Sequence, residues 1–165
     1  MKLRVGVLTI SDKGFKGERI DKGGPLIMKL VRENLEVIDI IYRLVPDNVD
    51  NIEKTLREWI STDVDLIITT GGTGPSPRDV TPEATLKVIE KRYYGLELLM
   101  LLEGIKKTPE AAFSRAVVGS SGGTLIINLP GNPKAIIENF PVLFPLLPHL
   151  MLEIKGIKGS HDEGN

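Results

Sequence analysis

The chain contains no cysteine and only two histidines among its 165 residues. Without cysteine it forms no disulfide, holds no iron–sulfur cluster and has no thiolate nucleophile. His149 lies in an apolar segment interrupted by proline, where we expect a structural role, and His161 lies in the polar segment GSHDEGN. The sequence therefore argues against an imidazole-ligated zinc site and against a Ser-His-Asp triad. Carboxylates, hydroxyls, cations and backbone N–H groups are left to carry any catalysis.

A strong net charge and a long apolar run are also lacking. The chain has 21 Lys and Arg against 22 Asp and Glu, a formal net charge of −1, so no global basic field attracts nucleic acid or an anionic membrane. The apolar stretch 140–152 contains three prolines and is too short to span a bilayer. The N-terminal MKLRVGVLTISD has too short an apolar core for a signal peptide. We therefore expect a cytoplasmic protein that binds anionic ligands through local groups.

Strand-like and helix-like segments alternate along the chain. Five segments have the composition of strands: 3–10, 37–45, 65–70, 116–119 and 124–129. Three helices are predicted from their start signals: one at Pro25, one after Asp47 or Asn48, and one at Thr81-Pro82-Glu83, where Thr81 is the expected hydroxyl cap. Two further helices are predicted over 95–107 and from 133 to about 154, the second bent by its prolines. Residues 13–23 are predicted to form a loop. This order predicts a three-layer αβα domain of the α/β class with a mostly parallel central sheet. We expect one domain over 1–156 and a polar, flexible tail over 157–165.

Aspartates follow three of the predicted strands. Asp12 comes after Ser11 at the end of the first strand, Asp47 follows the second, and Asp79 lies in the loop after the third. Taken singly, each aspartate is explained equally well as a helix cap or a turn former. In an open α/β sheet, however, ligands bind beyond the carboxyl ends of the strands. The shared position of the three acids at one sheet edge indicates a ligand site.

The loop after the third strand, within TTGGTGPSPRDVTPEA at 69–84, is rich in glycine, proline and hydroxyl groups. Gly71–Gly74 lacks side-chain bulk, apart from Thr73, so its N–H groups can face a bound anion. Thr73 and Ser76 add hydroxyls and Arg78 adds a guanidinium. The loop is neither a P-loop nor a dinucleotide fingerprint, because Gly-Lys-Ser/Thr and G-x-G-x-x-G are both absent. A purely structural turn is the alternative reading of this feature.

Asp79 would repel a phosphate bound by this loop unless a divalent cation lay between them. Mg²⁺ is commonly held by one or two carboxylates together with phosphate oxygens. Asp47, from the neighbouring strand exit, is the candidate for the second carboxylate. These residues point to phosphoryl or nucleotidyl transfer, which depends on positioning and charge neutralisation more than on a histidine base.

Five ordered segments resemble the molybdenum cofactor biosynthesis proteins of the MogA/MoaB type. They are VLTISD ending at Asp12, VPD ending at Asp47, TGGTGPSPRDVTPEA at 70–84, FSR at 113–115 and LPGNP at 129–133, and the closing Ile154-Lys-Gly156 also fits. The resemblance covers nearly the whole chain. It implies a molybdopterin-binding-like fold and a homotrimer.

The resemblance implies molybdopterin adenylyltransferase activity, in which molybdopterin and Mg-ATP give adenylylated molybdopterin and pyrophosphate. It assigns catalysis to Asp47 and Asp79, which are also the candidate Mg²⁺ ligands. The candidates for substrate and nucleotide binding are Ser11, Asp12, Gly71, Gly72, Thr73, Gly74, Ser76, Arg78, Glu83, Ser114, Ser120, Pro130, Gly131, Asn132 and Lys134. Some eukaryotic relatives have serine at the position of Gly123, and Ser120 or Ser121 is the candidate to replace that hydroxyl. The attacking phosphate of molybdopterin is already an anion, so no general base is required.

Two other functions compete with the transferase. One is a non-catalytic molybdopterin carrier or scaffold, which would gain little from two acids beside a phosphate. The other is a molybdate-insertion partner, which uses the same domain within a larger architecture. The expected partners are molybdopterin, ATP and a molybdate-insertion protein that receives the product, with neither nucleic acid nor a membrane among them.

Overall fold

A six-stranded sheet in the order β2-β1-β3-β6-β5-β4 forms the centre of the molecule. The structure is a computed structural model and describes residues 1–158. The four parallel strands are β1 (Leu3–Ile10), β2 (Val37–Val45), β3 (Leu66–Thr70) and β6 (Thr124–Leu129); β5 (Val118–Ser121) and β4 (Lys91–Arg92) add two antiparallel strands. The mostly parallel sheet predicted from the sequence is confirmed.

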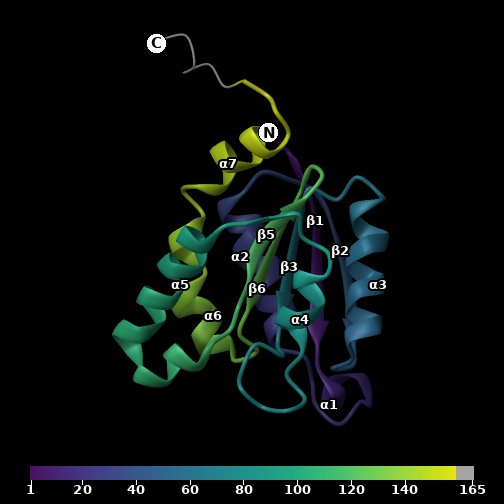
Figure 1. The fold of residues 1–165 in the computed structure, drawn as a ribbon, viewed down its shortest axis with the longest axis vertical. Coiled ribbons are helices and arrows are strands. Elements are labelled where there is room, and N and C mark those ends of the chain that lie inside the picture. The colour runs from purple at the N-terminus through teal and green to yellow at the C-terminus, as the bar shows by residue number, and fades with distance from the viewer. Residues whose placement is uncertain (159–165) are drawn as a thin grey trace.

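Helices cover both faces of the sheet and complete the three predicted layers (Figure 1). One face carries α3 (Val49–Ile60) and α4 (Thr81–Leu86), and the other carries α2 (Gly23–Asn34), α5 (Tyr94–Lys107), α6 (Pro133–Asn139) and α7 (Leu147–Ile154). Along β1, Val5 and Val7 pack on the α2 side while Leu8 and Ile10 pack on the α3 side. Both faces of a parallel strand are buried, which is why β1 is apolar almost throughout. One sheet shared by two cores supports the proposal of a single domain over 1–156.

The elements differ from the sequence predictions in a few places. A short helix α1 (Asp12–Phe15) and the start of α2 at Gly23 occupy part of the predicted loop 13–23. A 3₁₀ helix, η1 (Pro109–Phe113), follows the predicted helix 95–107 and was not itself predicted. Prolines divide the predicted C-terminal helix into α6, η2 (Pro141–Leu143) and α7, because proline removes a backbone donor and cannot continue a helix. The predicted tail lies, from residue 159 onward, outside the described residues.

Within residues 1–158 no single helix is long and apolar enough to cross a membrane. The segments 133–143 and 147–154 satisfy the length and composition criteria only when taken together, and they are bent by 67° relative to each other. Both segments contribute buried side chains to the core, among them Ile136, Leu143 and Met151.

Candidate functional site

The carboxyl ends of the four parallel strands meet at the lower edge of the sheet in Figure 1. A cavity of about 970 Å³ lies at this edge. Eleven of the residues predicted from the sequence line it: Ser11, Asp47, Gly71, Gly72, Thr73, Gly74, Asp79, Ser114, Pro130, Gly131 and Asn132. The strand order explains why these residues lie together. The strands β2, β1, β3 and β6 are consecutive neighbours, and the segments that follow them all leave the sheet at the same edge.

Asp12 and Asp47 are held together by reciprocal hydrogen bonds. The Asp12 N–H donates to Asp47 Oδ2 at 2.8 Å, and the Asp47 N–H donates to Asp12 Oδ1 at 3.0 Å. Asn48, not Asp47, caps α3 by accepting from Asn51 N–H. The carboxylate of Asp47 is therefore available to the cavity instead of being used as a helix cap.

Arg78 lies across Asp12 rather than along the cavity wall. Its Nε and Nη2 each donate to the Asp12 carboxylate at 3.0 Å. The sequence suggested a guanidinium directed at a bound phosphate, whereas the structure pairs it with the acid beside Asp47. Ser76, Glu83 and Lys134 likewise do not line the cavity.

The pKa values of the Asp47 and Asp12 carboxyls are shifted in opposite directions. Burial raises the pKa of the Asp47 carboxyl, and the negative charges of Asp12 and Asp79 raise it further against the opposing effects of the Asp12 N–H and Arg78. Burial would raise the pKa of Asp12 as well, but the Asp47 N–H and the Arg78 guanidinium outweigh it and the pKa is lowered. A cation bound beside Asp47 would favour the ionised form of its carboxyl.

The glycine-rich loop follows β3 with a backbone that only glycine adopts readily. Gly71 has φ 99° and Gly72 has φ 68°. A Cβ on Gly71 would overlap the Ile10 carbonyl oxygen, and one on Gly72 would overlap Thr81 Oγ1 and lie 3.1 Å from Asp47 Oδ1. Positive φ and close backbone approach both require glycine here. The loop can therefore pass directly beside Asp47.

Thr81 fixes the loop instead of capping a helix. The sequence predicted a hydroxyl cap at this position, but Thr81 is the first residue of α4 and Val80 precedes it without a side-chain cap bond. The fully buried Thr81 hydroxyl donates to the Gly71 carbonyl at 2.8 Å. The cap prediction is wrong because a long-range contact with the glycine loop takes the hydroxyl.

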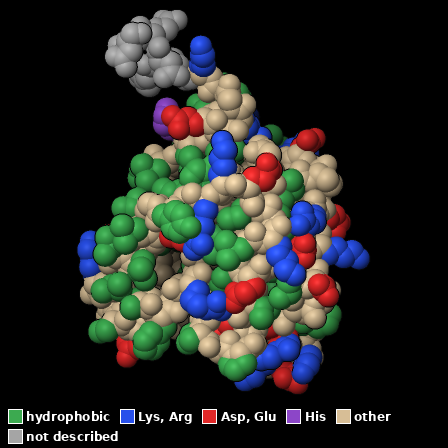
Figure 2. Space-filling view, in the orientation of Figure 1, with side chains coloured by type: hydrophobic (Ala, Val, Ile, Leu, Met, Phe, Trp, Pro, Cys, Tyr) green, Lys and Arg blue, Asp and Glu red, His purple; other side chains and the backbone are tan. Residues whose placement is uncertain are grey.

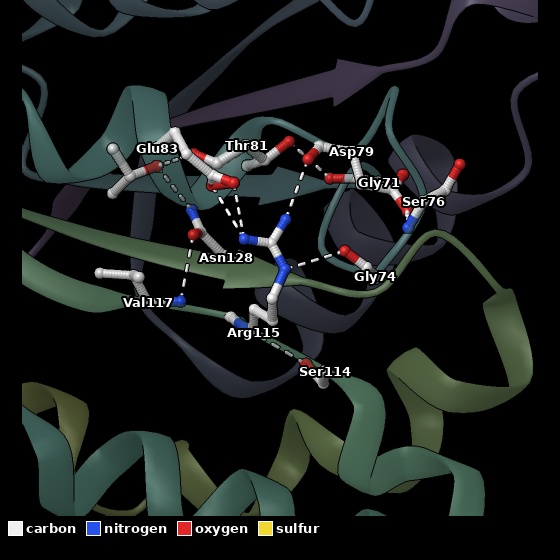
Figure 3. Close-up of polar contacts among 12 residues, drawn as sticks. Gly71, Gly74, Ser76, Asp79, Thr81, Glu83, Ser114, Arg115, Val117 and Asn128 are labelled. Carbon is white, nitrogen blue, oxygen red and sulfur yellow. Dashed lines mark hydrogen bonds and ion pairs between the residues drawn. The ribbon is translucent and has the colours of Figure 1, made fainter.

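Arg115 bonds to two residues of the loop and to one residue of α4 (Figure 3). Its Nε donates to the Gly74 carbonyl at 2.9 Å, its Nη2 donates to the Asp79 carbonyl at 2.9 Å, and its Nη1 donates to the Glu83 carboxylate at 2.6 and 3.0 Å. Glu83 is therefore engaged with Arg115. Asp79 Oδ2 accepts from the Ser76 N–H at 3.0 Å, so this turn holds one carboxylate oxygen in place. The sequence showed Arg115 only as part of the FSR motif, since nothing local indicates a partner 32 residues away.

Ser120 is not brought to this edge. It lies on β5, which pairs antiparallel with β6, so it sits opposite Leu125 near the beginning of β6 and at the far end of the sheet. Its hydroxyl is hydrogen-bonded to the Tyr93 hydroxyl at 2.7 Å. Ser121 lies beside it and bonds to Glu90. The predicted role for Ser120 or Ser121 in phosphate binding is corrected by the strand direction, which the loop-like sequence concealed.

Several cavity residues were missed by the sequence analysis. They include Arg19, Asp21, Lys22, Thr108 and Asn139, whereas Phe113 was noted only as part of the FSR segment. Asp21 accepts from the Thr9 hydroxyl at 2.7 Å and from the Tyr42 hydroxyl at 2.6 Å. Burial of the Tyr42 hydroxyl and, second, its hydrogen bond to Asp21 raise the pKa of Tyr42 to about 12. The only signal in the sequence that segment 13–23 contributes to the cavity was its positively charged residues. A polar segment without periodicity resembles an ordinary surface loop, so this signal was not specific.

Asp47 and Asp79 fit a magnesium ion that arrives with phosphates. Within residues 1–158 no group of three or more His, Cys, Asp or Glu side chains is arranged so that it could hold a metal ion. Both aspartates nevertheless line the same cavity as the glycine loop. Mg²⁺ bound through one or two carboxylates takes its remaining ligands from substrate phosphates and water, which is the donor set available at this edge.

Comparisons with known proteins give consistent results. Residues 6–149 match the family described as "Probable molybdopterin binding domain". The molybdenum cofactor synthesis protein cinnamon of Drosophila melanogaster is 46% identical over 145 residues, which cover 87% of this chain and 24% of that longer protein. A molybdopterin adenylyltransferase of Helicobacter pylori is 41% identical over 156 residues, 93% of this chain and 89% of that one. The crystal structure of the molybdopterin biosynthesis enzyme MoaB of Thermus thermophilus superposes with a TM-score of 0.86 at 47% identity, covering 93% of this chain and 97% of that one.

Proposed function

The chain belongs to the molybdopterin-binding domain family of molybdenum cofactor biosynthesis, and from this premise we propose that it is a molybdopterin adenylyltransferase. A terminal phosphate oxygen of molybdopterin attacks the α-phosphorus of ATP. The new P–O bond gives adenylylated molybdopterin, and the bond to the β-phosphate breaks to release pyrophosphate. The observation that carries this proposal is the placement of Asp47 and Asp79 in one cavity with the glycine loop Gly71–Gly74.

The residues of this edge address the main difficulty of the reaction, which is to bring two polyanions together. The Gly71 N–H is bonded to the Leu129 carbonyl at 3.1 Å, but Gly72, Thr73 and Gly74 also line the cavity. Their backbone N–H groups would supply donors that do not have to reorganise. Asp47 and Asp79 would hold the magnesium of Mg-ATP, whose charge would offset that of the phosphates. Asp12 and Arg78 position Asp47 through the reciprocal backbone bonds and the guanidinium pair. The attacking group is already ionised, so no histidine is needed.

An assay of the full chain with molybdopterin, ATP and Mg²⁺ tests the proposal. The transferase releases one pyrophosphate for each adenylylated pterin formed. A carrier or scaffold binds the pterin and releases no pyrophosphate. A molybdate-insertion protein acts on the adenylylated pterin together with molybdate and also releases none in this assay. We place the reaction in the cytoplasm and propose that a molybdate-insertion protein receives the product.

Arg78 is expected to set the acid limb of the pH–activity profile. Its positive charge lowers the pKa of Asp47, so Arg78→Gln leaves that pKa higher still. Because the ionised carboxylate is the useful form, activity falls as pH decreases through this pKa, and the acid limb of kcat/KM in Arg78→Gln moves to higher pH. The difference from wild type should shrink in 1 M salt, since Arg78 is 69% exposed and its field is screened.

The control for this measurement is Lys91→Gln, which removes one positive charge from an exposed position on β4. Its pH profile should coincide with that of the wild type. An unchanged acid limb in Arg78→Gln would show that Asp47 does not govern the profile.

We also propose a homotrimer, supported by an apolar surface on α5. Leu99, Leu102 and Ile105 are exposed, between 37% and 47%, and hydrophobic side chains gather over α5 in Figure 2. Exposed apolar patches of this kind commonly mark subunit contacts. Sedimentation equilibrium should show a trimer that Leu102→Glu dissociates, whereas Ile38→Glu on β2 leaves it intact; a wild-type monomer would contradict the proposal.

A further inference from the structure

A second cavity of about 320 Å³ adjoins the site, between α5 and the segment that follows η1. Ala111, Ser114, Pro130 and Asn139 line both cavities, so the two are neighbours along one wall. Apolar and aromatic side chains make much of the second wall: Tyr94, Leu98, Met100, Leu101 and Ala116. Such a wall suits a flat ring, while the adjoining glycine loop suits a phosphate.

Most polar side chains of the second cavity are engaged with the protein. Arg92 pairs with Glu97 at 2.9 Å, and Arg115 pairs with Glu83. Asn128 is fully buried and satisfied: its Nδ2 donates to Thr69 Oγ1 and Thr85 Oγ1, both at 3.0 Å, and its Oδ1 accepts from the Val117 N–H at 3.1 Å. These groups therefore have structural roles in the cavity wall.

Asn139 differs from Asn128 in this respect. It is the last residue of α6 and only 8% exposed, yet its buried Oδ1 has no hydrogen-bond partner among residues 1–158. Oδ1 lies over Gly104 of α5, where a Cβ at residue 104 would be 2.6 Å from it. A buried polar atom without a partner is costly to keep. Asn139 lines both cavities, so its amide would gain the missing bond by turning toward a ligand that supplies a donor.

We propose that Asn139 is a specificity-determining residue that binds the edge of a fused nitrogen heterocycle seated in the second cavity. A carboxamide offers one acceptor and two donors side by side, the complement of a ring edge that carries an N–H next to an acceptor. The end torsion of an asparagine is soft, so Oδ1 turns toward the ring as the ligand enters. The phosphate of the same ligand then reaches the first cavity past Ser114 and Pro130.

This inference rests on the proposed function for the identity of the ligand, because both substrates of that reaction carry such a ring. One is the pterin and the other is the adenine of the nucleotide. Three probes separate the sources: neopterin for the pterin ring, AMP for the adenine ring, and ribose 5-phosphate, which has a phosphate and no ring. Pyrophosphate release by the wild type is measured in a separate assay. If no pyrophosphate is released, the proposed function fails, but the binding of the three probes still tests the role of Asn139.

The test replaces Asn139 with leucine, which has a similar size and no polar atoms. Without ligand, Asn139→Leu should unfold about 2–5 °C above the wild type, since an unsatisfied buried group is removed. The Kd of neopterin or of AMP should rise by about tenfold or more, while that of ribose 5-phosphate stays within about twofold. The probe that loses affinity identifies the ring held in the second cavity.

Asn128→Leu is the matched control, since it removes three satisfied hydrogen bonds from the same wall and should lower the unfolding temperature. Asn139→Ala is measured in parallel, so the proposal can still be tested if a leucine is not accommodated at residue 139. Unchanged affinities for all three probes, or an equal loss for all three, would overturn the assignment.

Discussion

Replacing Asp79 with asparagine is expected to lower kcat by about 10²–10³-fold, the usual scale for losing one charge-stabilising group in an active site. The exchange removes a negative charge from the cavity but keeps the size of the side chain. Its carbonyl oxygen can still accept the Ser76 N–H that Asp79 Oδ2 accepts at 3.0 Å, so the turn is retained. Steady-state kinetics with molybdopterin and Mg-ATP measure the loss.

Binding measurements separate charge from structure in this variant. Asp79→Asn should bind molybdopterin about as well as the wild type, because asparagine adds no repulsion. Asp50→Asn is the control: it makes the same exchange at an exposed position in the first turn of α3 and should leave kcat unchanged. Normal turnover by Asp79→Asn would end the assignment of this residue to catalysis.

Gly71→Ala is expected to be the most disruptive single-methyl change near the site. Gly71 has φ 99°, and a Cβ there would overlap the carbonyl oxygen of Ile10. An unfavourable backbone conformation of about 1–2 kcal/mol and overpacking of about 1–3 kcal/mol together predict a loss of about 2–5 kcal/mol in the free energy of unfolding. Urea denaturation measures it. Turnover should fall as well, because the loop moves away from Asp47.

The control for Gly71→Ala is Gly122→Ala. Gly122 also has positive φ, 56°, but a Cβ there meets no atom within 4 Å. This variant should lose about 1 kcal/mol through conformation alone and keep full turnover, since Gly122 lies in the β5–β6 turn at the other end of the sheet. Equal losses in the two variants would show that the close approach to Ile10 contributes nothing.

Local patterns predicted the fold and the core of the candidate site. Apolar runs in 3–10 and 124–129 indicated strands buried on both faces, and each forms a strand of the parallel part of the sheet. The alternation of strands and helices then required polar residues at the strand ends to share one edge. Asp47, Asp79 and the loop 71–74 are close together for that reason. Residue type and spacing suffice here because neighbouring parallel strands end at the same edge.

Contacts between distant segments could not be derived in this way. The Arg78 guanidinium could have faced a phosphate, and only the folded chain shows that it pairs with Asp12, 66 residues away. Thr81 resembles a helix cap until β3 brings the Gly71 carbonyl to its hydroxyl. Ser120 resembles a loop residue until the antiparallel direction of β5 carries it to the far edge. In each case the local sequence allows several hydrogen-bond partners for the side chain and does not favour one of them.

The sequence by itself determined the class of fold, the absence of thiol chemistry, and the group of acids and glycines at one sheet edge. Each of these follows from composition, periodicity or the geometry common to parallel sheets. Only the tertiary structure decided which donor meets which acceptor, and which buried amide, that of Asn139, has an oxygen without a partner in residues 1–158. Hydrogen bonds act over about 3 Å, and the packing of the whole chain decides which groups come that close.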